Sequence, residues 1–301
     1  MSRYAVIDIG TNSVKLHVAR EVHGRLSVLA DEAVVTRLGE RMDDDGDLNE
    51  FAMERTLVAV SGMVARAEAL GAEKIAAVGT AAFRRAANAD EFIKMILKRT
   101  KLRVKVITGE EEARLAALAV RRSLDLSGER VVVADIGGGS TELVVMKGEL
   151  ILSVASIPIG VRTLCDTYAS HAPMAEDEND ALNRAITEAL DGQAIEASTL
   201  VGVGGTAATL AAINLKMGTF DPQRIHGHRL SRDDVEDIYE QIAAMTLPER
   251  RRVPGLPSDR ADVMPVGAAV VLALLKASGA TDLLVCRCGL RQGVLADRFL
   301  T

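Results

Sequence analysis

The sequence predicts an α/β protein built from two related domains. An apolar strand–turn–strand segment at the start of the chain recurs near its middle, and after each copy the pattern alternates between helices and strands. The 301 residues leave room for two hydrophobic cores, and 48% apolar with 26% charged residues is typical of a globular protein.

The repeated segment has the same residues at its turn in both copies. Asp8-Ile-Gly-Thr-Asn-Ser13 is matched 127 positions later by Asp135-Ile-Gly-Gly-Gly-Ser140, and apolar residues flank both turns. This pattern predicts two strands joined by a tight turn. Backbone amides in a glycine-containing turn can cradle an anion, because no Cβ blocks its approach. Two such turns facing each other across a cleft would hold one polyanion from both sides.

Neither turn matches a nucleotide-binding loop. The chain contains no Gly-x-x-x-x-Gly-Lys-Ser/Thr string, so a P-loop is excluded. A dinucleotide-binding loop opens a helix, whereas residues 14–18 and 142–146 are apolar and predict strands.

The first half of the chain continues with strands and then with alternating helices and strands. Asn49 is a suitable N-cap for a helix that ends before Gly71. The predicted strands are 25–29 continued by 33–36, 74–79 and 103–107, and the predicted helices are 49–70, 91–98 and 109–122.

The second half repeats this order. The predicted strands are 131–135, 142–147, 150–156, 200–203 and 282–285, and the predicted helices are 176–190, 206–213, 232–245, 260–277 and 291–299. The polar segment 127–129 is the natural junction. We therefore expect domains at 1–126 and 127–301, with the last helix free to pack back on the first domain.

Composition limits the possible partners. The net charge is −6, aromatic residues make up 3% and tryptophan is absent, so neither electrostatic attraction to nucleic acid nor base stacking is expected. No apolar run is long enough to span a membrane and no leader is evident, so we expect a cytoplasmic protein without a membrane partner.

The three cysteines are sparse, which fits a reducing compartment. Cys286-Arg-Cys288 follows an apolar run and predicts a buried strand end, because its spacing differs from the Cys-x-x-Cys pairs of zinc sites. Cys165 is expected in the core, since neither Asp166 nor Tyr168 supplies an activating cation.

Taken together, six segments resemble the exopolyphosphatase/guanosine pentaphosphate phosphatase family of the actin–hexokinase–heat-shock ATPase superfamily. They are Asp8-Ile-Gly-Thr-Asn-Ser13, Gly79-Thr-Ala-Ala-Phe-Arg-Arg-Ala-Ala-Asn88, Gly109-Glu-Glu-Glu-Ala-Arg-Leu115, Asp135-Ile-Gly-Gly-Gly-Ser-Thr-Glu142, Gly202-Val-Gly-Gly-Thr206 and Gly289-Leu-Arg-Gln-Gly293. The resemblance covers essentially the whole chain. It implies two actin-like (ribonuclease H-like) domains with mixed sheets flanked by helices, an active site in the interdomain cleft, and the short two-domain form. A homodimer is also expected from the family.

The resemblance assigns the general base to Glu112, which would orient the attacking water. Glu111 is the alternative, and acidic residues at a helix N-terminus also interact favourably with the helix dipole without any catalytic role. The resemblance also assigns phosphate contact to Arg84, whose guanidinium can bind phosphate bidentately. Basic residues between 84 and 105 could steer a long polyphosphate, or they could form an ordinary solvated helix face.

The remaining candidates bind phosphate or a divalent cation. Magnesium on a polyphosphate takes one or two carboxylates, so we expect Asp135 and Glu142 as ligands and Asp8 next to them; the two aspartates could equally cap their turns. The turn at Gly204 and Gly205 follows a strand and could contact a nucleotide, a later phosphate, or only its neighbours. The complete phosphate-contact set is Gly10, Thr11, Asn12, Ser13, Arg84, Gly138, Gly139, Ser140, Thr141, Gly204 and Gly205.

The predicted function is that of a magnesium-dependent exopolyphosphatase (or one that uses another divalent cation) acting on inorganic polyphosphate by in-line water attack. The alternative is a phosphatase that converts guanosine pentaphosphate (pppGpp) to the tetraphosphate. The Glu112 motif argues against a small-molecule kinase of the superfamily, and the presence of both Glu112 and Glu142 argues against a non-catalytic sensor of such alarmones.

Overall fold

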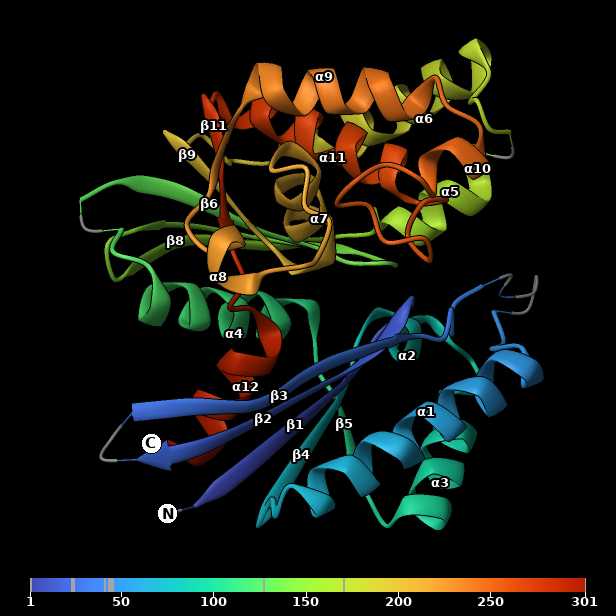
Figure 1. The fold of residues 1–301 in the computed structure, drawn as a ribbon, viewed down its shortest axis with the longest axis vertical. Helices are drawn as coiled ribbons and strands as arrows, with labels where there is room; N and C mark the ends of the chain where they lie inside the picture. Colours follow the sequence, from blue (N-terminus) through green and yellow to red (C-terminus); the bar gives the residue numbers. More distant parts are fainter. Residues whose placement is uncertain are drawn as a thin grey trace. The chain divides into compact units, whose positions relative to one another are not determined.

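The computed structural model describes residues 2–22, 25–40, 42, 46–126, 128–169 and 171–300. Packing divides the chain into two compact units (Figure 1). The first unit is Met1–Leu115 with Leu290–Thr301, and the second is Ala116–Gly289. The domain boundary expected at 126/127 stays a prediction, and Ser127 lies outside the described residues.

The first unit contains a five-stranded mixed sheet in the order β3-β2-β1-β4-β5. Its strands are β1 (Arg3–Ile9), β2 (Ser13–Val22), β3 (Arg25–Val35), β4 (Lys74–Gly79) and β5 (Val104–Val106). β1, β2 and β3 are antiparallel neighbours, whereas β4 is parallel to β1 and β5 to β4. β3 is one continuous strand where the sequence predicted two pieces, and it pairs with β2 around an irregularity between Val18 and Ala19.

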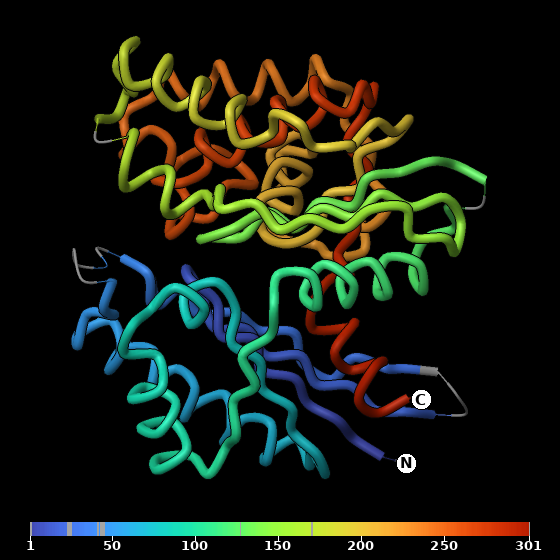
Figure 2. Tube along the Cα trace, turned by 180° about the vertical axis from the view of Figure 1, so that it is seen from behind, coloured from blue at the N-terminus to red at the C-terminus, as the bar shows by residue number. Residues whose placement is uncertain are grey.

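The two faces of this sheet pack against different helices. Ala5, Ile7 and Ile9 share a core with α1 (Glu50–Ala69) and α3 (Ala89–Thr100), while Val6 packs with α12 (Leu290–Phe299). Figure 2 shows α12, in red, beside β1, with which it makes close contacts. Because side chains alternate along a strand, Asp8 lies on the same face as Val6, toward α12.

The start of α1 follows from its cap. The Asn49 side chain accepts a hydrogen bond from the Phe51 amide at 2.9 Å, as the sequence predicted. At the other side of the sheet, the ring of Tyr4 stacks on Phe299 with centroids 4.7 Å apart, so the two chain ends meet in this unit.

The second unit repeats the same strand arrangement. Its sheet has the order β10-β11-β9-β6-β7-β8, in which β6, β7 and β8 are antiparallel and β9 and β11 continue in parallel from β6. The strands are β6 (Arg130–Ile136), β7 (Thr141–Lys147), β8 (Leu150–Ile157), β9 (Thr199–Val203), β10 (Arg229–Ser231) and β11 (Asp282–Cys286). The order β8-β7-β6-β9-β11 therefore matches β3-β2-β1-β4-β5, and the predicted duplication extends from the turns to whole sheets.

The helices fit the sequence prediction with a few differences. Those not yet given are α2 (Ala81–Arg85), α4 (Gly109–Ser123), α5 (Val161–Tyr168), α6 (Glu176–Leu190), α7 (Gly204–Asn214), α8 (Pro222–Ile225), α9 (Arg232–Ala243), α10 (Leu247–Arg250) and α11 (Met264–Ser278). The predicted start of α11 at residue 260 was wrong: the helix begins at Met264, because Pro265 fits the first turn, where no amide donor is needed. Helix α5, at eight residues, was not predicted.

Among the described residues, none of the helices combines the length and hydrophobicity needed for a membrane span.

Candidate functional site

The two repeated turns are closed by the same hydrogen bond. The Gly10 amide donates to the carbonyl of Ser13 at 3.0 Å, and the Gly137 amide donates to the carbonyl of Ser140 at 2.9 Å. A Cβ at either glycine would lie 3.0–3.2 Å from the serine carbonyl that its own amide reaches, which explains why glycine stands there. The sequence repeat is therefore a repeat of backbone geometry.

Backbone amides from a neighbouring segment hold the carbonyls of the first turn. Gly39 donates to the carbonyl of Thr11 at 2.9 Å, and the amides of residues 36 and 37 donate to the carbonyl of Asn12 at 3.0 and 2.9 Å. A trans peptide directs its N–H opposite to its C=O. The amides of Asn12 and Ser13 therefore point away from the segment that holds this turn.

The second turn is held in the same way by the first residues of α5. Val161 donates to the carbonyl of Gly137 at 2.9 Å, and the amides of residues 162 and 163 donate to the carbonyl of Gly138 at 2.9 and 3.1 Å. The amides of Gly138 and Gly139 are thus directed to the opposite side. A Cβ at Gly160 would lie only 2.3–2.5 Å from backbone atoms of Gly138 and Gly139, so only glycine allows α5 to approach this closely.

Two side chains of the predicted set form an ion pair in the first unit. Nη1 of Arg84 donates to Oε2 of Glu112 at 2.7 Å and to the carbonyl of Ile107 at 3.2 Å. Glu112 is 7% exposed. The carboxyl ends of β1, β4 and β5 lie at one edge of the sheet, since Ile9 pairs with Gly79 and Gly79 with Val106. The first turn, Arg84 and Glu112 all follow this edge, where ligands of α/β proteins bind.

The neighbouring acids of α4 have different surroundings. Oε1 of Glu111 accepts hydrogen bonds from Nζ of Lys105 at 2.6 Å and from Arg298 at 3.4 Å, in ion pairs at the protein surface. The pKa of Glu110 is lowered, first by its own backbone amide and next by the Thr108 side chain, at the helix start. These contacts account for Glu110 and Glu111 without a catalytic role and distinguish them from the buried Glu112.

The charge opposite the turn aspartate differs between the two units. In the first unit Asp8 pairs across the strands with Lys15, whose Nζ lies 3.6 Å from Oδ2 of the aspartate. In the second unit the same register places Glu142 opposite Asp135. Like charges directly opposite one another on a sheet are destabilising, so this position is suited to a cation.

Two serine hydroxyls donate hydrogen bonds to Glu142. Oε1 of Glu142 accepts hydrogen bonds from Oγ of Ser140 at 2.6 Å and from Oγ of Ser156 at 2.9 Å. Thr141 donates its hydroxyl to the carbonyl of Ile159 at 2.6 Å and is completely buried, which gives it a structural role in the turn. In the described part of the chain, no cluster of three or more His, Cys, Asp or Glu side chains is arranged to hold a metal ion.

The glycines at the start of α7 lie close to Asp135 and to an arginine that sequence reasoning missed. A Cβ at Gly204, whose φ is +80°, would lie 2.8 Å from Oδ1 of Asp135, and one at Gly205 would lie 2.2 Å from Nη1 of Arg260. Burial lowers the pKa of Arg260, and its buried Nε has no hydrogen-bond partner among the described residues. An incompletely paired guanidinium at a helix start is suited to an anion.

An ion pair between Arg162 and Asp262 holds the segment that carries Arg260. Nη1 of Arg162 donates to Oδ2 of Asp262 at 2.8 Å, and the amide of Arg162 donates to the carbonyl of Gly138. This pair connects the segment that carries Arg260 to the second turn. No local pattern indicates that Arg260 lies beside Gly205, because the two residues are far apart in the sequence.

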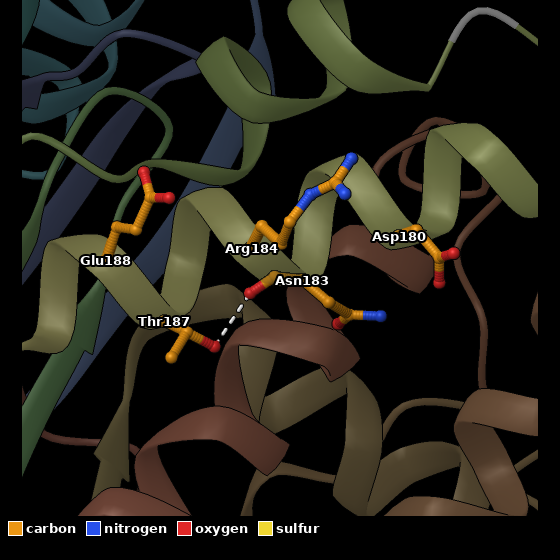
Figure 3. Close-up of a pocket in the computed structure, with 5 residues that line it drawn as sticks. All are labelled: Asp180, Asn183, Arg184, Thr187 and Glu188. Carbon is orange, nitrogen blue, oxygen red and sulfur yellow. Dashed lines mark hydrogen bonds between the residues drawn. The ribbon is translucent and has the colours of Figure 1, made fainter.

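A pocket on α6 contains none of the predicted site residues. Figure 3 shows its lining residues along this one helix, with Oγ1 of Thr187 donating to the carbonyl of Asn183 at 2.8 Å. Its lining residues are Asp180, Asn183, Arg184, Thr187 and Glu188. No residue of either turn lines this pocket, and we assign it no part in the candidate site.

Within each unit, the structure therefore gathers the predicted residues at one sheet edge. The first unit gathers those on the first turn, Arg84 and Glu112, with Asp8 at the end of β1. The second gathers those on the second turn, Asp135, Glu142 and the glycines of α7. Asp8 belongs to a different unit from Asp135 and Glu142, so the three carboxylates do not form one cluster within a unit.

Comparison with known proteins gives a consistent result. The model of the Ppx/GppA phosphatase family matches residues 17–301. A curated relative, the guanosine-5'-triphosphate,3'-diphosphate pyrophosphatase of Photobacterium profundum, is 30% identical over 300 residues. The match covers 98% of this chain and 59% of that relative, so the chain spans less than two thirds of the relative's length.

Solved structures resemble the chain over almost its whole length. A Ppx/GppA family member from Aquifex aeolicus is 35% identical with a TM-score of 0.84, covering 99% of this chain and 98% of its own. An exopolyphosphatase from Cytophaga hutchinsonii ATCC 33406 is 29% identical with a TM-score of 0.92, covering 98% of this chain and 96% of its own. These similarities, with the two matching mixed sheets, confirm the predicted fold class.

Proposed function

Since this chain belongs to the Ppx/GppA phosphatase family, we propose that it is a phosphoanhydride hydrolase that releases terminal orthophosphate from inorganic polyphosphate. The observation that carries the proposal is the buried Glu112, held 2.7 Å from Arg84 at the sheet edge that also carries the first turn. A carboxylate and a guanidinium in contact are the two groups that in-line phosphoryl transfer to water requires: one orients the water and the other stabilises charge.

In this proposal each turn binds phosphate through its own backbone amides. The amides of Asn12 and Ser13 would bind one phosphate group, and those of Gly138 and Gly139 another. The side chain of Ser13 would add a hydroxyl donor, whereas the Ser140 hydroxyl donates to Glu142. Arg260, which adjoins Gly205, would contribute a second guanidinium to the phosphate-binding set.

Glu112 would act once a phosphate group displaces it from Arg84. Arg84 would then bind the phosphate oxygens, and the released carboxylate would accept a hydrogen bond from water and take its proton as the P–O bond forms. The bond between the terminal phosphorus and the bridging oxygen would break, and that oxygen would leave as part of the shortened polyphosphate chain, so no covalent intermediate with the protein is needed.

A divalent cation fits the second unit better than the first. Asp135 and Glu142 supply hard oxygen ligands in directly opposed positions, whereas Asp8 already has the Lys15 ammonium 3.6 Å away. Asp135 and Glu142 would therefore hold the ion, with Asp8 as the proposed additional ligand. When bound, the cation would neutralise charge on the phosphate oxygens. Magnesium is the ion that we expect.

Guanosine pentaphosphate is the second candidate substrate. The observation in its favour is the name of the relative from Photobacterium profundum, a pyrophosphatase of guanosine-5'-triphosphate,3'-diphosphate. Its 5'-triphosphate presents the same terminal phosphoanhydride as polyphosphate, so the same residues would serve both substrates.

The test is release of orthophosphate from each substrate in separate reactions with magnesium. Faster release from polyphosphate would support the proposal, faster release from pppGpp would favour the alternative, and equal rates would mean that the site serves both. Release from neither substrate would overturn the assignment.

The matched variants are Glu112→Gln and Glu111→Gln. Removal of a general base typically costs about 10²–10⁴-fold in rate, so Glu112→Gln should lose most of the activity while still binding polyphosphate. Glu111→Gln should keep the rate close to the wild type, because Glu111 faces Lys105 and Arg298 at the surface. The reverse result would transfer the role to Glu111.

A further inference from the structure

The Cys-x-Cys segment after β11 lies at the same sheet edge as the second turn. Cys286 is the last residue of β11 and pairs with Val203 of β9, which in turn pairs with Asp135 of β6. Gly289 follows within three residues, where a Cβ would lie 3.6 Å from Val203 and 3.9 Å from Oδ2 of Asp135. The two cysteines therefore adjoin the candidate site, although nothing in the proposed hydrolysis uses them.

The two thiols lie together in a small hydrogen-bonded network. Sγ of Cys286 lies 3.3 Å from Oγ of Ser123, at the end of α4, and 3.3 Å from the carbonyl oxygen of Cys288. The two side chains also lie close enough for each to shift the pKa of the other. Cys286 is buried, whereas Cys288 is partly exposed, so a small reagent reaches Cys288 first.

The backbone between the cysteines is bent, which matters for ring closure. In an extended strand, residues i and i+2 lie about 6.6 Å apart, near the upper limit for the Cα atoms of a disulfide. The strand ends at Cys286 and the chain bends at Arg287, so the segment is no longer extended. Leaving the extended conformation shortens the separation of residues i and i+2, which is the direction that a disulfide requires.

His226 faces the same network and is held in one tautomer. The amide of Arg287 donates to Nδ1 of His226 at 3.4 Å, so Nδ1 is an acceptor and Nε2 carries the proton. Nε2 then donates to the carbonyl of Ser123 at 3.1 Å. The histidine connects the end of α4 to the segment between the cysteines and places a polar group next to the thiols.

The ionisation of the pair favours reaction at Cys288. The pKa of Cys288 is lowered, chiefly by the hydrogen bond from Cys286, with support from Ser123, His226 and Arg287. The pKa of Cys286 is raised, chiefly by the same hydrogen bond and by burial. Cys288 therefore favours the thiolate form and Cys286 the thiol form. A redox-active pair needs a thiolate as its nucleophilic cysteine and a second, resolving cysteine beside it.

We propose that Cys286 and Cys288 form a redox-active dithiol site that a hydroperoxide converts to an intramolecular disulfide. The Cys288 thiolate attacks one peroxide oxygen, the O–O bond breaks, and the other oxygen leaves as hydroxide, which gives a sulfenic acid at Cys288. Sγ of Cys286 then attacks that sulfur, an S–S bond forms, and the sulfenic hydroxyl leaves with the Cys286 proton as water. In total, two thiols and one hydroperoxide yield one disulfide, water and, from hydrogen peroxide, a second water.

The ring that this bond closes contains a single intervening residue. So small a ring is strained, and strained disulfides are more easily reduced than structural ones. The site would therefore interconvert reversibly between the dithiol and the disulfide, and the disulfide would not serve as a structural cross-link. This inference does not depend on the proposed hydrolysis, because its test reads the thiols alone.

The experiment treats the full chain with hydrogen peroxide in a metal-chelating buffer and follows free thiols and mass. The wild type, which has three cysteines, should fall from three free thiols to one, lose two hydrogens in mass, and recover both thiols with dithiothreitol. Trypsin cleaves after Arg287, so the disulfide should hold the two resulting fragments together. Cys165→Ser is the matched control and should form the same disulfide.

The single variants separate the two steps. Cys286→Ser should stop at a sulfenic acid on Cys288 that dimedone traps, and Cys288→Ser should form neither product. The proposal is overturned if the wild type keeps three thiols, if it forms only disulfides between two chains, or if oxidation goes only to sulfinic acid at Cys288.

Discussion

Nη1 of Arg84 lies 2.7 Å from Oε2 of Glu112, and both side chains are largely shielded from water. The two residues belong to α2 and α4, which follow adjacent parallel strands at one sheet edge. Each of them is a candidate for contact with the reacting phosphate. The ion pair therefore holds the two groups in the closed arrangement that a substrate would have to open.

Replacing Arg84 should affect stability and substrate binding together. Arg84→Ala leaves a shielded carboxylate without its guanidinium, and we expect a loss of about 1–3 kcal/mol in unfolding free energy with weaker polyphosphate binding. Arg84→Lys restores the charge but not the bidentate geometry, so it should recover stability more than affinity. Urea unfolding and a polyphosphate-binding assay measure the two effects.

The matched control for this prediction is Arg85→Ala. Arg85 is the exposed neighbour of Arg84 on the same helix. An equal loss of affinity in both variants would show that general positive charge, and not the Arg84 contact, attracts the substrate.

Gly160 should tolerate no side chain. In Gly160→Ala the new Cβ would lie 2.3–2.5 Å from the backbone of the second turn, so α5 or the turn has to move. Overpacking of this kind typically costs about 1–3 kcal/mol. Gly218→Ala, where no atom lies within 4 Å, should change the unfolding free energy little. Similar unfolding midpoints for the two variants would contradict the close approach.

Magnesium should stabilise the protein through the opposed carboxylates of the second unit. A cation between Asp135 and Glu142 relieves their repulsion, and at one hundred times its dissociation constant a ligand adds about 2.7 kcal/mol. Glu142→Gln should lose most of the rise in Tm that magnesium gives, while its Tm in EDTA should be no lower than that of the wild type, because the repulsion with Asp135 is removed. Thermal unfolding with magnesium and with EDTA measures both values.

The control for the magnesium experiment removes a carboxylate from the opposite end of the hairpin of β7 and β8, away from Glu142. Glu149 precedes β8 directly, and its side chain is 95% exposed. Glu149→Gln should keep the full response to magnesium. An equal response in Glu142→Gln would place the ion elsewhere.

The cysteines should differ in their reactivity with pH. Burial raises the pKa of the Cys165 thiol to about 11, despite the nearby Arg162, so it should react with iodoacetamide only in strongly alkaline solution or after unfolding. The lowered pKa of Cys288 keeps its thiolate at neutral pH, and its reaction should slow only as the pH falls through that lowered value. Mass spectrometry of the alkylated peptides measures each rate.

Two groups of charged and polar residues face these thiols. Cys286, Ser123, His226 and Arg287 face Cys288, and Arg162, Asp166, Asp262 and Arg250 face Cys165. Faster labelling of Cys165 than of Cys288 at pH 7 would contradict both assignments.

The fold was predicted well because residues close together in the sequence specify its hairpins and helix starts. The glycine turn and its flanking apolar runs specify each hairpin, and the Asn49 cap fixes the start of α1. Helix α5 was missed because eight residues offer too short a periodic pattern. Its role also comes from tertiary packing, since its first amides hold the carbonyls of the second turn.

The sequence predicted which residues form the candidate site, but it did not predict which of these side chains contact one another. The resemblance named Arg84 and Glu112, yet their hydrogen bond depends on how α2 and α4 pack. Arg260 was missed because it reaches Gly205 from a distant segment. The roles of the named site residues and the dimer remain predictions.

Backbone hydrogen bonds hold the carbonyls of both turns and so make the turns rigid. A loop that is already rigid loses little conformational entropy when an oxyanion arrives, so its affinity depends on the tetrahedral shape and charge of the anion rather than on the rest of the molecule. Released orthophosphate has that same shape. If the turns bind substrate as proposed, the product competes for them, and accumulating phosphate slows the enzyme by inhibition that vanadate and sulfate should mimic.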